Sequence, residues 1–494
     1  MQRYNFLLRI DNVKKKLYLC IQSIKTVFLL KNMIQTKEIN SYFSQFIDSS
    51  LSVLGEDAFS AVRREEARRF HEKGIPSQND EMWRGFAWEK IMQNTYSIQQ
   101  DADPYMPVDS YFNCEAHNID SYLFAFLNGF YIHRNAALTI FPNGLIIGGL
   151  NAAVSQYPTL IADAMQKMKN GQYAAMHSIN QTLWKDGLFV YVPDNLHVDK
   201  PVQLVNLVKT KADLFINPKN LIIVGKNASL KLIHCDDTLE SNHSLINGTM
   251  DILVEENANL DYFKLENKEN KSILINHLNV YQYANSRVST HTNTFNGGLV
   301  HNTISANLLE EHAHISLNGL FLADREQNVS NCLSVKHYAP NCSSKQLYNG
   351  ILDDAAKARF TGHIYVAPDA QKTEAYQLNH NILLTDEAEI STQPFLEIYA
   401  DDVKCSHGAT VGQLDDNAVF YLRSRGICEK NARMLLMHAF AKEVIDTINI
   451  ASLQLYIENL VEKRLMGQPI ACTQCPLLCC ENKPIEFKVN IPEV

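Results

Sequence analysis

Two short segments decide the fold: NASLKL at residues 227–232 and NANLDY at residues 257–262. In each of them a polar residue and a small residue precede a run in which polar and apolar residues alternate. The same pattern returns at residues 285–289, 312–317 and 387–391. Alternation with a period of two is typical of a β-strand that buries one face, so each segment predicts a strand.

The spacing of these segments predicts a repeat architecture. The first four begin at residues 227, 257, 285 and 312, so they lie 30, 28 and 27 residues apart. Intervals of this length are typical of solenoids, in which each unit buries its apolar face only against its neighbours. Alternation argues against helical repeats, and the lack of long amphipathic patterns between residues 201 and 412 argues against leucine-rich and ankyrin repeats. We therefore expect a mainly β chain whose core, over residues 196–425, is a right-handed parallel β-helix.

Asparagine and glycine at the ends of the expected strands predict tight turns. NGG at residues 296–298 and NG at residues 318–319 are two such places. Both residue types tolerate a positive φ angle, so we expect turns that require one at these positions.

The segments on either side of the core carry helical patterns. Apolar residues at three-to-four spacing over residues 39–51, and a charged segment over 61–73, predict helices in an N-terminal region that we place at 33–195 together with its leading strands. We expect a further helix over residues 174–184 and a strand over 188–192. Beyond residue 426, two apolar stripes at helical spacing predict a C-terminal helical region at 426–466.

The two ends of the chain differ from the rest. Residues 1–32 are interpreted as a non-native or disordered extension before Met33, with an organelle-targeting peptide as the alternative. The tail at 467–494 carries four cysteines in nine residues: Cys472, Cys475, Cys479 and Cys480. They could ligate zinc or an iron-sulfur cluster, but no second ligand pair has the spacing of a zinc ribbon, so we interpret them as an exposed, reduced tail.

Composition narrows the class of protein. The 494 residues are 46% hydrophobic and 20% charged, with a net charge of −9. An acidic chain without a basic arm argues against nucleic acid as a partner, and the lack of a long apolar run argues against a membrane span. Eleven scattered cysteines without a secretory signal indicate reduced thiols and a cytoplasmic location.

No catalytic motif stands out. The chain has neither a phosphate-binding Gly-x-x-x-x-Gly-Lys-Ser/Thr loop nor a Gly-x-Ser-x-Gly elbow. Aspartate pairs at residues 236–237, 353–354 and 401–402 leave open a carbohydrate-active enzyme, because a β-helix could gather them on one face. We expect no enzyme and assign no catalytic or cofactor-binding residue.

The segment EIYADDVKCSHGATVG at residues 397–412 holds the candidate site. If it forms a strand, Cys405 and His407 lie on one side, roughly 6.5 Å apart along the chain, and Lys404 and Ser406 lie on the other. A thiol and an imidazole so close could bind one metal ion or pair as nucleophile and base. A buried cysteine beside a hydrogen-bonded histidine is the third interpretation.

This segment, with FYLRSRG at residues 420–426, resembles the C-terminal signature of the SufB/SufD family, the scaffold proteins of Suf iron-sulfur cluster assembly. It is most similar to the SufD branch, because it lacks the Glu-His-Glu-Ala-Thr type of sequence found in the SufB branch. The resemblance implies the same β-helix architecture. His380 falls where the SufB branch carries a cysteine, and we regard it as a weaker candidate than His407.

The resemblance also implies partners and a role. It implies a SufB-SufC-SufD complex, with SufB bound through the β-helix edge and the SufC ATPase bound through the C-terminal helices. His407 and Cys405 would then be metal ligands at the SufB interface, for a transient iron-sulfur cluster shared with SufB, and no tightly bound cofactor is expected. Help with iron acquisition belongs to the same expectation. A SufB-like subunit that carries the cluster, or a β-helix carbohydrate-active enzyme, are the alternatives.

Overall fold

The structure is a computed structural model that describes residues 36–53, 57, 59–77, 80–101, 119–132, 136–168, 174–209, 211–238 and 243–466. The chain divides into two compact units. The first contains the described residues up to Gln93 together with residues 174–182, and the second contains the others. Our expectations for residues 1–32 and for the cysteine-rich tail at 467–494 lie outside the described residues.

Helices form the first unit. They are a helix over residues 36–52, α2 (Ser60–Lys73), α3 (Trp88–Met92) and most of α6 (Ala175–Leu183). Ile39, Phe43 and Ile47 share one face of the first helix and are buried. The ring of Phe43 packs edge-on against Phe70 of α2. The helices predicted over residues 39–51, 61–73 and 174–184 are therefore confirmed.

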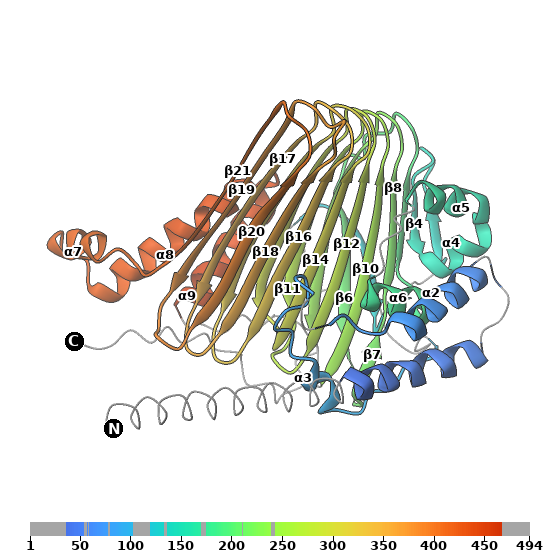
Figure 1. Ribbon diagram of the computed structural model, residues 1–494, viewed down its shortest axis with the longest axis horizontal. Helices are drawn as coiled ribbons and strands as arrows, with labels where there is room; N and C mark the ends of the chain where they lie inside the picture. Colours follow the sequence, from blue (N-terminus) through green and yellow to red (C-terminus); the bar gives the residue numbers. More distant parts are fainter. Residues whose placement is uncertain are drawn as a thin grey trace, which may run out of the picture. The chain divides into compact units, whose positions relative to one another are not determined.

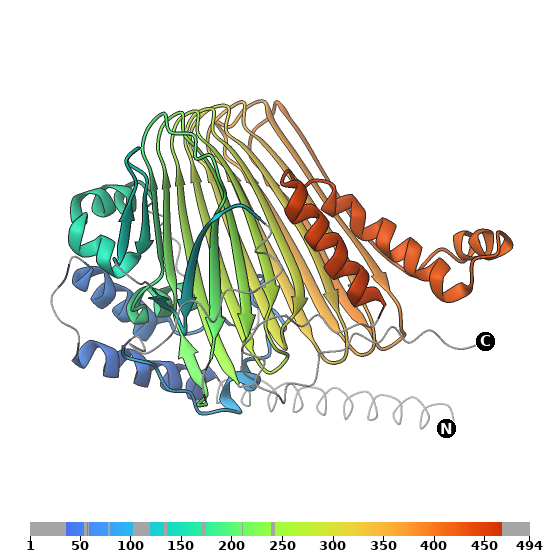
Figure 2. The ribbon, with the colours of Figure 1, turned by 180° about the vertical axis from the view of Figure 1, so that it is seen from behind.

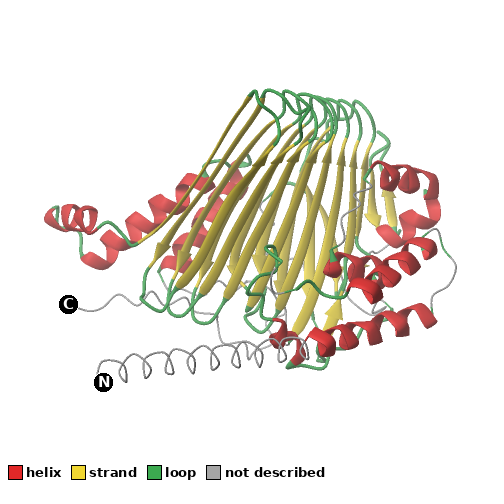
Figure 3. Ribbon diagram, in the orientation of Figure 1, coloured by secondary structure: helices red, strands yellow, loops and turns green. Residues whose placement is uncertain are grey.

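The second unit is a β-solenoid of about 8 turns, in which the chain alternates between two sheets (Figures 1 and 3). In pairing order, the described strands of the first sheet are β2 (Phe130–Ile132), β1 (Tyr122–Leu127), β6 (Val202–Val208), β9 (Ser229–Thr238), β11 (Asn259–Asn267), β13 (Arg287–Asn296), β15 (His314–Ala323), β17 (Ser343–Leu352), β19 (Thr373–Leu383) and β21 (Val403–Gly412). From β1 and β6 onward, each of these pairs is parallel.

The second sheet completes each coil. Its described strands are, in pairing order, β20 (Glu389–Ile398), β18 (Lys357–Val366), β16 (Asn328–His337), β14 (Leu299–Leu308), β12 (Ile273–Gln282), β10 (Ser244–Val254), β8 (Lys219–Val224), β5 (Leu188–Val192), β4 (Ile146–Gly149) and β3 (Leu138–Ile140), and β7 (Leu214–Ile216) pairs with β10. Two helices, α4 (Leu150–Gln156) and α5 (Pro158–Lys167), follow β4. The prediction of a mainly β chain with a β-helix core is confirmed.

The repeat seen in the sequence marks one corner of the solenoid. Asn227, Asn257, Asn285 and His312 have φ angles of 55°, 58°, 58° and 62°, and each precedes a strand of the first sheet. Asparagine is one of the few residues that adopt a positive φ readily, so the corner explains the recurring residue type. The segment at 387–391 differs, because it leads into β20 of the second sheet.

One of the two predicted turns is correct and the other is wrong. Gly297 has a φ of 137° and lies between β13 and β14, as expected. Gly319, in contrast, lies inside β15 and not at a turn. A Cβ atom at Gly319 would come 2.1 Å from the ring of Tyr348 on the next coil, so the glycine makes room for that ring.

Among the described residues, three helices follow β21: α7 (Asp416–Ser424), α8 (Glu429–Ile445) and α9 (Ala451–Leu465). Of these, α8 and α9 pack on the outer face of the first sheet, whereas α7 extends away from it, as Figure 2 shows from behind. Met437, Val444 and Ile457 bury their side chains against residues of the sheet that include Phe263 and Phe295. The stripes predicted from the sequence are thus largely core-facing.

The boundary of the core differs from the expected residue 425. The last strand ends at Gly412, and α7 begins at Asp416 with Asp415 as its N-cap, whose side chain accepts a hydrogen bond from the Asn417 amide. The capping aspartate is the local signal for this helix start. None of the helices in the described part of the chain is long and apolar enough to cross a membrane.

Candidate functional site

The last coil of the solenoid is open. Among the described strands, β20 and β21 each pair with a neighbour on one side only. The backbone N–H and C=O groups along their outer edges therefore have no partner strand within the described residues, and such an edge is a template for pairing with another chain. Apolar side chains on these edges are also exposed, among them Ile398 (37%) and Val411 (47%).

Cys405 and His407 lie on this open coil, side by side on one face of β21. In the parallel register with β19, Cys405 is opposite Ala375 and His407 is opposite Gln377. Ala375 and Gln377 are fully buried inside the solenoid, so Cys405 and His407 face the same interior. No coil follows β21 among the described residues, and therefore Cys405 is only half-buried and His407 is exposed.

The chemistry of Cys405 favours a ligand over an activated nucleophile. Its side chain packs with Ile364, Val366 and Ala375 in a small apolar cluster. Burial in this cluster raises the pKa of the Cys405 thiol, although a hydrogen bond involving the Ala375 backbone acts in the opposite direction. A thiol with a raised pKa is protonated at neutral pH, and a metal ion would displace its proton.

The described residues supply only part of a ligand set. Among the described residues, no group of three or more histidine, cysteine, aspartate or glutamate side chains could hold a metal ion. Cys405 and His407 supply two donors, whereas iron in clusters is held by more ligands per cluster. Any remaining ligands would have to come from outside the described residues.

His380 belongs to a different surface. It lies on β19, and its ring nitrogen Nδ1 is 2.8 Å from the hydroxyl of Thr410 on β21. Its neighbours along the strand, Asn379 and Asn381, are buried inside the solenoid, so His380 faces outward. The structure therefore does not bring His380 and His407 together.

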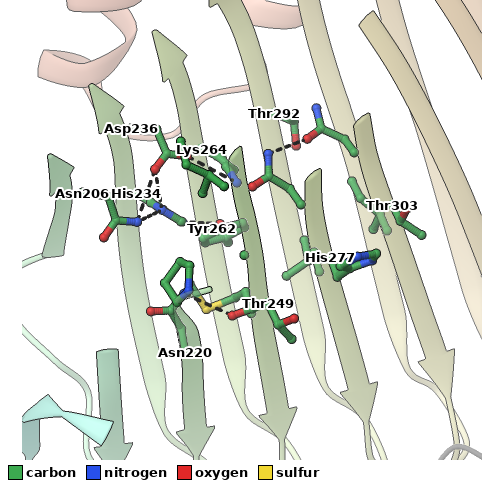
Figure 4. Close-up of a pocket in the computed structure, with 18 residues that line it drawn as sticks. Asn206, Asn220, His234, Asp236, Thr249, Tyr262, Lys264, His277, Thr292 and Thr303 are labelled. Carbon is green, nitrogen blue, oxygen red and sulfur yellow. Dashed lines mark hydrogen bonds and ion pairs between the residues drawn. The ribbon is translucent and has the colours of Figure 1, made fainter. Parts of the chain in front are cut away.

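A second group of candidate residues lines an internal pocket between the two sheets (Figure 4). His234 lies 2.7 Å from the amide of Asn206 and 2.8 Å from the hydroxyl of Tyr262. Asp236 accepts a hydrogen bond from Asn206 at 3.2 Å and pairs with Lys264 at 3.5 Å. Burial lowers the pKa of His234, so its ring is neutral and acts within a hydrogen-bond network.

The polar network continues into the next coils with its charges compensated. Glu266, which is fully buried, lies 3.5 Å from Lys264. It also accepts hydrogen bonds from Thr294, Asn276 and Asn302 at 2.6, 2.8 and 2.9 Å. A buried network that satisfies its charges makes a core rigid and specific.

Local pattern reasoning missed this network, although the sequence carries a signal for it. The inward positions of β9 run Leu230, Leu232, His234, Asp236, and those of β11 run Leu260, Tyr262, Lys264, Glu266. In both strands the alternation continues while the inward residues change from apolar to polar. Comparing inward positions between repeats would have predicted a polar section of the core.

The aspartate pairs do not form a common site. Asp236 is buried inside the solenoid, whereas its neighbour Asp237 lies on the other side of β9. Asp353 and Asp354 follow β17, where the Asp354 carboxylate accepts a hydrogen bond from the Arg325 amide. Residues 401–402 precede β21 and are exposed. The three pairs therefore serve separate strands and turns.

Comparison with known proteins identifies the family. The family model "SUF system FeS cluster assembly, SufBD core domain" matches residues 207–440, and "SufBD protein N-terminal region" matches residues 36–204. The iron-sulfur cluster assembly protein SufD of Escherichia coli is 27% identical over 399 residues, which cover 80% of this chain and 90% of that protein. SufD of Bacillus subtilis is 22% identical, covering 67% and 77%.

A cyanobacterial relative supports the same conclusion. The iron-sulfur cluster assembly SufBD family protein of Synechocystis is 29% identical over 350 residues, which cover 69% of this chain and 77% of that protein. The core match spans the solenoid from β7 to the open coil with Cys405 and His407, and it ends within α8. The chain therefore belongs to the SufB/SufD family of iron-sulfur cluster assembly proteins, in which its relatives include SufD.

Proposed function

We propose that this chain is a SufD-type scaffold subunit that, together with SufB and SufC, holds an iron-sulfur cluster during its assembly. The observation that carries the proposal is the open last coil, on which Cys405 and His407 face an interior that none of the described strands covers further. The cluster is the cargo of this coil and not a resident cofactor. The chain itself is non-catalytic in this proposal, and it works in the cytoplasm.

The two side chains suit transient binding of iron or of a nascent cluster. Thiolate is a soft ligand and neutral imidazole is a borderline one, and both bind iron in proteins. Because Cys405 and His407 supply only part of a ligand set, a cluster would be complete only when a partner adds its own ligands. Mixed cysteine and histidine ligation also holds a cluster less tightly than four thiolates do, which favours its transfer. The same pair of donors would help the complex to acquire iron.

The edges of β20 and β21 support SufB as the partner at this end. A second solenoid that presents its own terminal strands could continue both sheets across the junction. Tyr399, which is 57% exposed, and the exposed Ile398 and Val411 would lose their contact with water in such a junction. The junction would place the face of Cys405 and His407 between the two subunits.

The C-terminal helices support a second contact, with the SufC ATPase. The inward faces of α8 and α9 pack on the solenoid. Phe420 (72% exposed) and Tyr421 on α7, Leu435 on α8 and Leu455 on α9 point to solvent. Exposed aromatic and aliphatic side chains on adjacent helices are typical of a protein interface. The chain lacks a phosphate-binding loop, so hydrolysis of ATP would fall to SufC.

Co-purification and cluster formation test the proposal together. The tagged chain is co-expressed with SufB and SufC, and we expect all three to elute as one complex. The variant His407→Ala should keep the complex but lower the iron and sulfide recovered with it by about tenfold, the lower end of the range seen for perturbed metal sites. His380→Ala is the matched control, because it removes a histidine from the outer face of the neighbouring strand. Failure to recover SufB or SufC, or equal cluster content in His407→Ala and wild type, would overturn the proposal.

A further inference from the structure

Side-chain amides on successive coils stack into ladders in this solenoid. At one corner, the Asn257 amide nitrogen donates to the Asn227 carbonyl oxygen at 3.0 Å, and Asn227 donates in the same way to Asn195 at 2.9 Å. Each amide therefore donates to the coil before it and offers its own oxygen to the coil after it. At the end of such a ladder, the last amide therefore has a carbonyl oxygen that can accept a hydrogen bond from the following coil.

A ladder of the same polarity lies inside the last coils and ends at the open one. The Gln377 amide nitrogen on β19 donates a hydrogen bond to the Gln346 carbonyl oxygen on β17. Both glutamines are buried, with 0% and 2% of their surfaces exposed. Among the described residues, the remaining oxygen of Gln377, Oε1, has no hydrogen-bond partner. A buried acceptor without a donor costs free energy, so a donor near this oxygen would stabilise the structure.

The next residue along the ladder is His407. It is opposite Gln377 in the parallel register of β19 and β21, and neighbouring strands are about 4.8 Å apart. Of the residues on the inward face of β21 beside it, Ala409 has no polar side-chain atom and Cys405 is a weak donor. Among these inward side chains of β21, His407 is therefore the one best suited to donate to the Gln377 oxygen.

Gly362 on the opposite sheet lets the glutamine adopt this position. A Cβ atom at Gly362 would lie 2.0 Å from the Gln377 amide nitrogen, so any larger residue would displace the amide. The absence of a side chain on β18 thus leaves the space that the Gln377 amide occupies. The position of the Gln377 amide thus depends on residues from two coils and from both sheets, which indicates a specific packing arrangement.

We propose that Gln377, held by Gln346, positions His407. Its Oε1 has no partner among the described residues, so the exposed His407 ring has to turn toward it to donate one N–H. That hydrogen bond fixes the tautomer of the imidazole and leaves the other nitrogen unprotonated and facing the open edge. A histidine that binds a metal commonly donates its second N–H to an oxygen in this way. The inference rests on the proposed function, because it assigns Gln377 a role only if His407 is a ligand. Gln377 is a positioning residue and does not itself touch the cluster.

The tautomer of His407 can be measured directly on the full chain. With ¹⁵N-labelled histidine, the two ring nitrogens of a single tautomer have widely separated NMR shifts, and the His407 signals are assigned as those missing from His407→Gln. We expect one dominant tautomer in the wild type. Gln377→Leu removes the acceptor, and Gly362→Ala displaces it, so both should move the two shifts toward each other. Unchanged shifts in both variants would overturn the proposal.

Two further variants separate positioning from general damage to the fold. Asn379→Leu disturbs a buried polar residue on the same strand, opposite Ala409, and should leave the His407 shifts as in the wild type. Gln377→Glu keeps an oxygen at the same place and should restore a single tautomer. If Asn379→Leu changes the shifts as much as Gln377→Leu does, a specific role for Gln377 is excluded.

Cluster recovery with SufB and SufC distinguishes this inference from the function on which it rests. We expect Gln377→Leu to lower cluster content in the same direction as His407→Ala, and Gln377→Glu to recover most of it. If His407→Ala has no effect, the proposed function of the open coil fails. If His407→Ala lowers cluster content while Gln377→Leu leaves both the content and the tautomer unchanged, the positioning role alone is wrong.

Discussion

The middle coils and the last coil of the solenoid both place polar side chains on the inward face of the first sheet but satisfy them differently. In the middle, Lys264 lies between Asp236 and Glu266, at 3.5 Å from each carboxylate. At the end, one oxygen of Gln377 has no donor in the described part of the chain, and the neighbouring His407 is exposed. The first region is a closed network whose groups stabilise one another. The second region keeps polar groups that could still bind a partner or a metal ion.

The strongest test of this difference is to remove the cation of the closed network. Lys264→Met leaves the buried carboxylates of Asp236 and Glu266 without their shared partner, so we expect the free energy of unfolding to fall by about 3–5 kcal/mol. Urea denaturation followed by circular dichroism measures it. His407→Ala, at the open end, should change the same quantity by less than about 0.5 kcal/mol.

A double variant tests the reason for that loss. Replacing Lys264 and Asp236 together, by Met and Leu, removes one carboxylate along with the cation, and Glu266 keeps its three hydrogen-bond donors. Stability should then recover in part, because a well-packed apolar pair can replace a buried ion pair. A double variant less stable than Lys264→Met would show that the charges are not the cause.

Acid should destabilise the closed part of the solenoid through its buried histidines. Burial lowers the pKa of His291 to about 4, and its ring stacks on Phe263 with 5.0 Å between centroids. Below about pH 6.5 His291 binds a proton in the unfolded chain but not yet in the folded chain. The free energy of unfolding therefore decreases as the pH falls from about 6.5 to 4. The contribution is at most about 3 kcal/mol at pH 4.

The variant His291→Gln isolates this effect. Its free energy of unfolding should fall less steeply between pH 6.5 and 4 than that of the wild type, whatever its stability at neutral pH. His301 and His337 are also buried, with pKa values lowered by burial to about 3 and about 4, so a reduced slope should remain. Identical slopes for the variant and the wild type would contradict the prediction.

A charge introduced at the open edge should change the affinity for a partner and leave the stability of the fold nearly unchanged. Val411→Lys places a cation on the exposed edge strand β21, a common device against edge-to-edge pairing. We expect affinity for SufB to fall by about tenfold, or about 1.4 kcal/mol, with little change in thermal unfolding. Leu455→Lys on α9, an exposed apolar position away from the edge, is the matched control and should leave SufB binding unchanged.

The fold could be predicted from the sequence because its determinants are local. Alternation within each strand and an asparagine at several corners, such as Asn227 and Asn257, both appear in a short window. The contacts that could not be predicted from the sequence join residues about one coil apart. Gly319 and Tyr348, like Gln346 and Gln377, meet only after the coils stack in register.

The candidate site shows the same division. The spacing of Cys405 and His407 predicts their shared face, since both belong to one strand. That this face lies on the last coil, and that a buried glutamine stands behind His407, depends on where stacking stops. A local pattern carries no information on which repeat is the last one to be covered, and so the openness of the site could not be predicted from it.

The smallest expected effect concerns the reactivity of Cys405. Burial raises the pKa of its thiol, and only the thiolate reacts with iodoacetamide. In the isolated chain at pH 7.5, alkylation of Cys405 should therefore be a few times slower than that of the exposed Cys428 at the start of α8. Mass spectrometry of the two peptides over time measures both rates in one sample, so Cys428 serves as the internal reference.

Two comparisons connect this rate to the open coil. The rate at Cys405 should rise with pH over the range in which its thiol ionises, and binding of SufB should suppress it while Cys428 continues to react. A Cys405 that reacts faster than Cys428 would instead indicate an activated nucleophile and would contradict a ligand role. A slow thiol that SufB protects has the properties of a ligand that gives up its proton only when metal and partner arrive together.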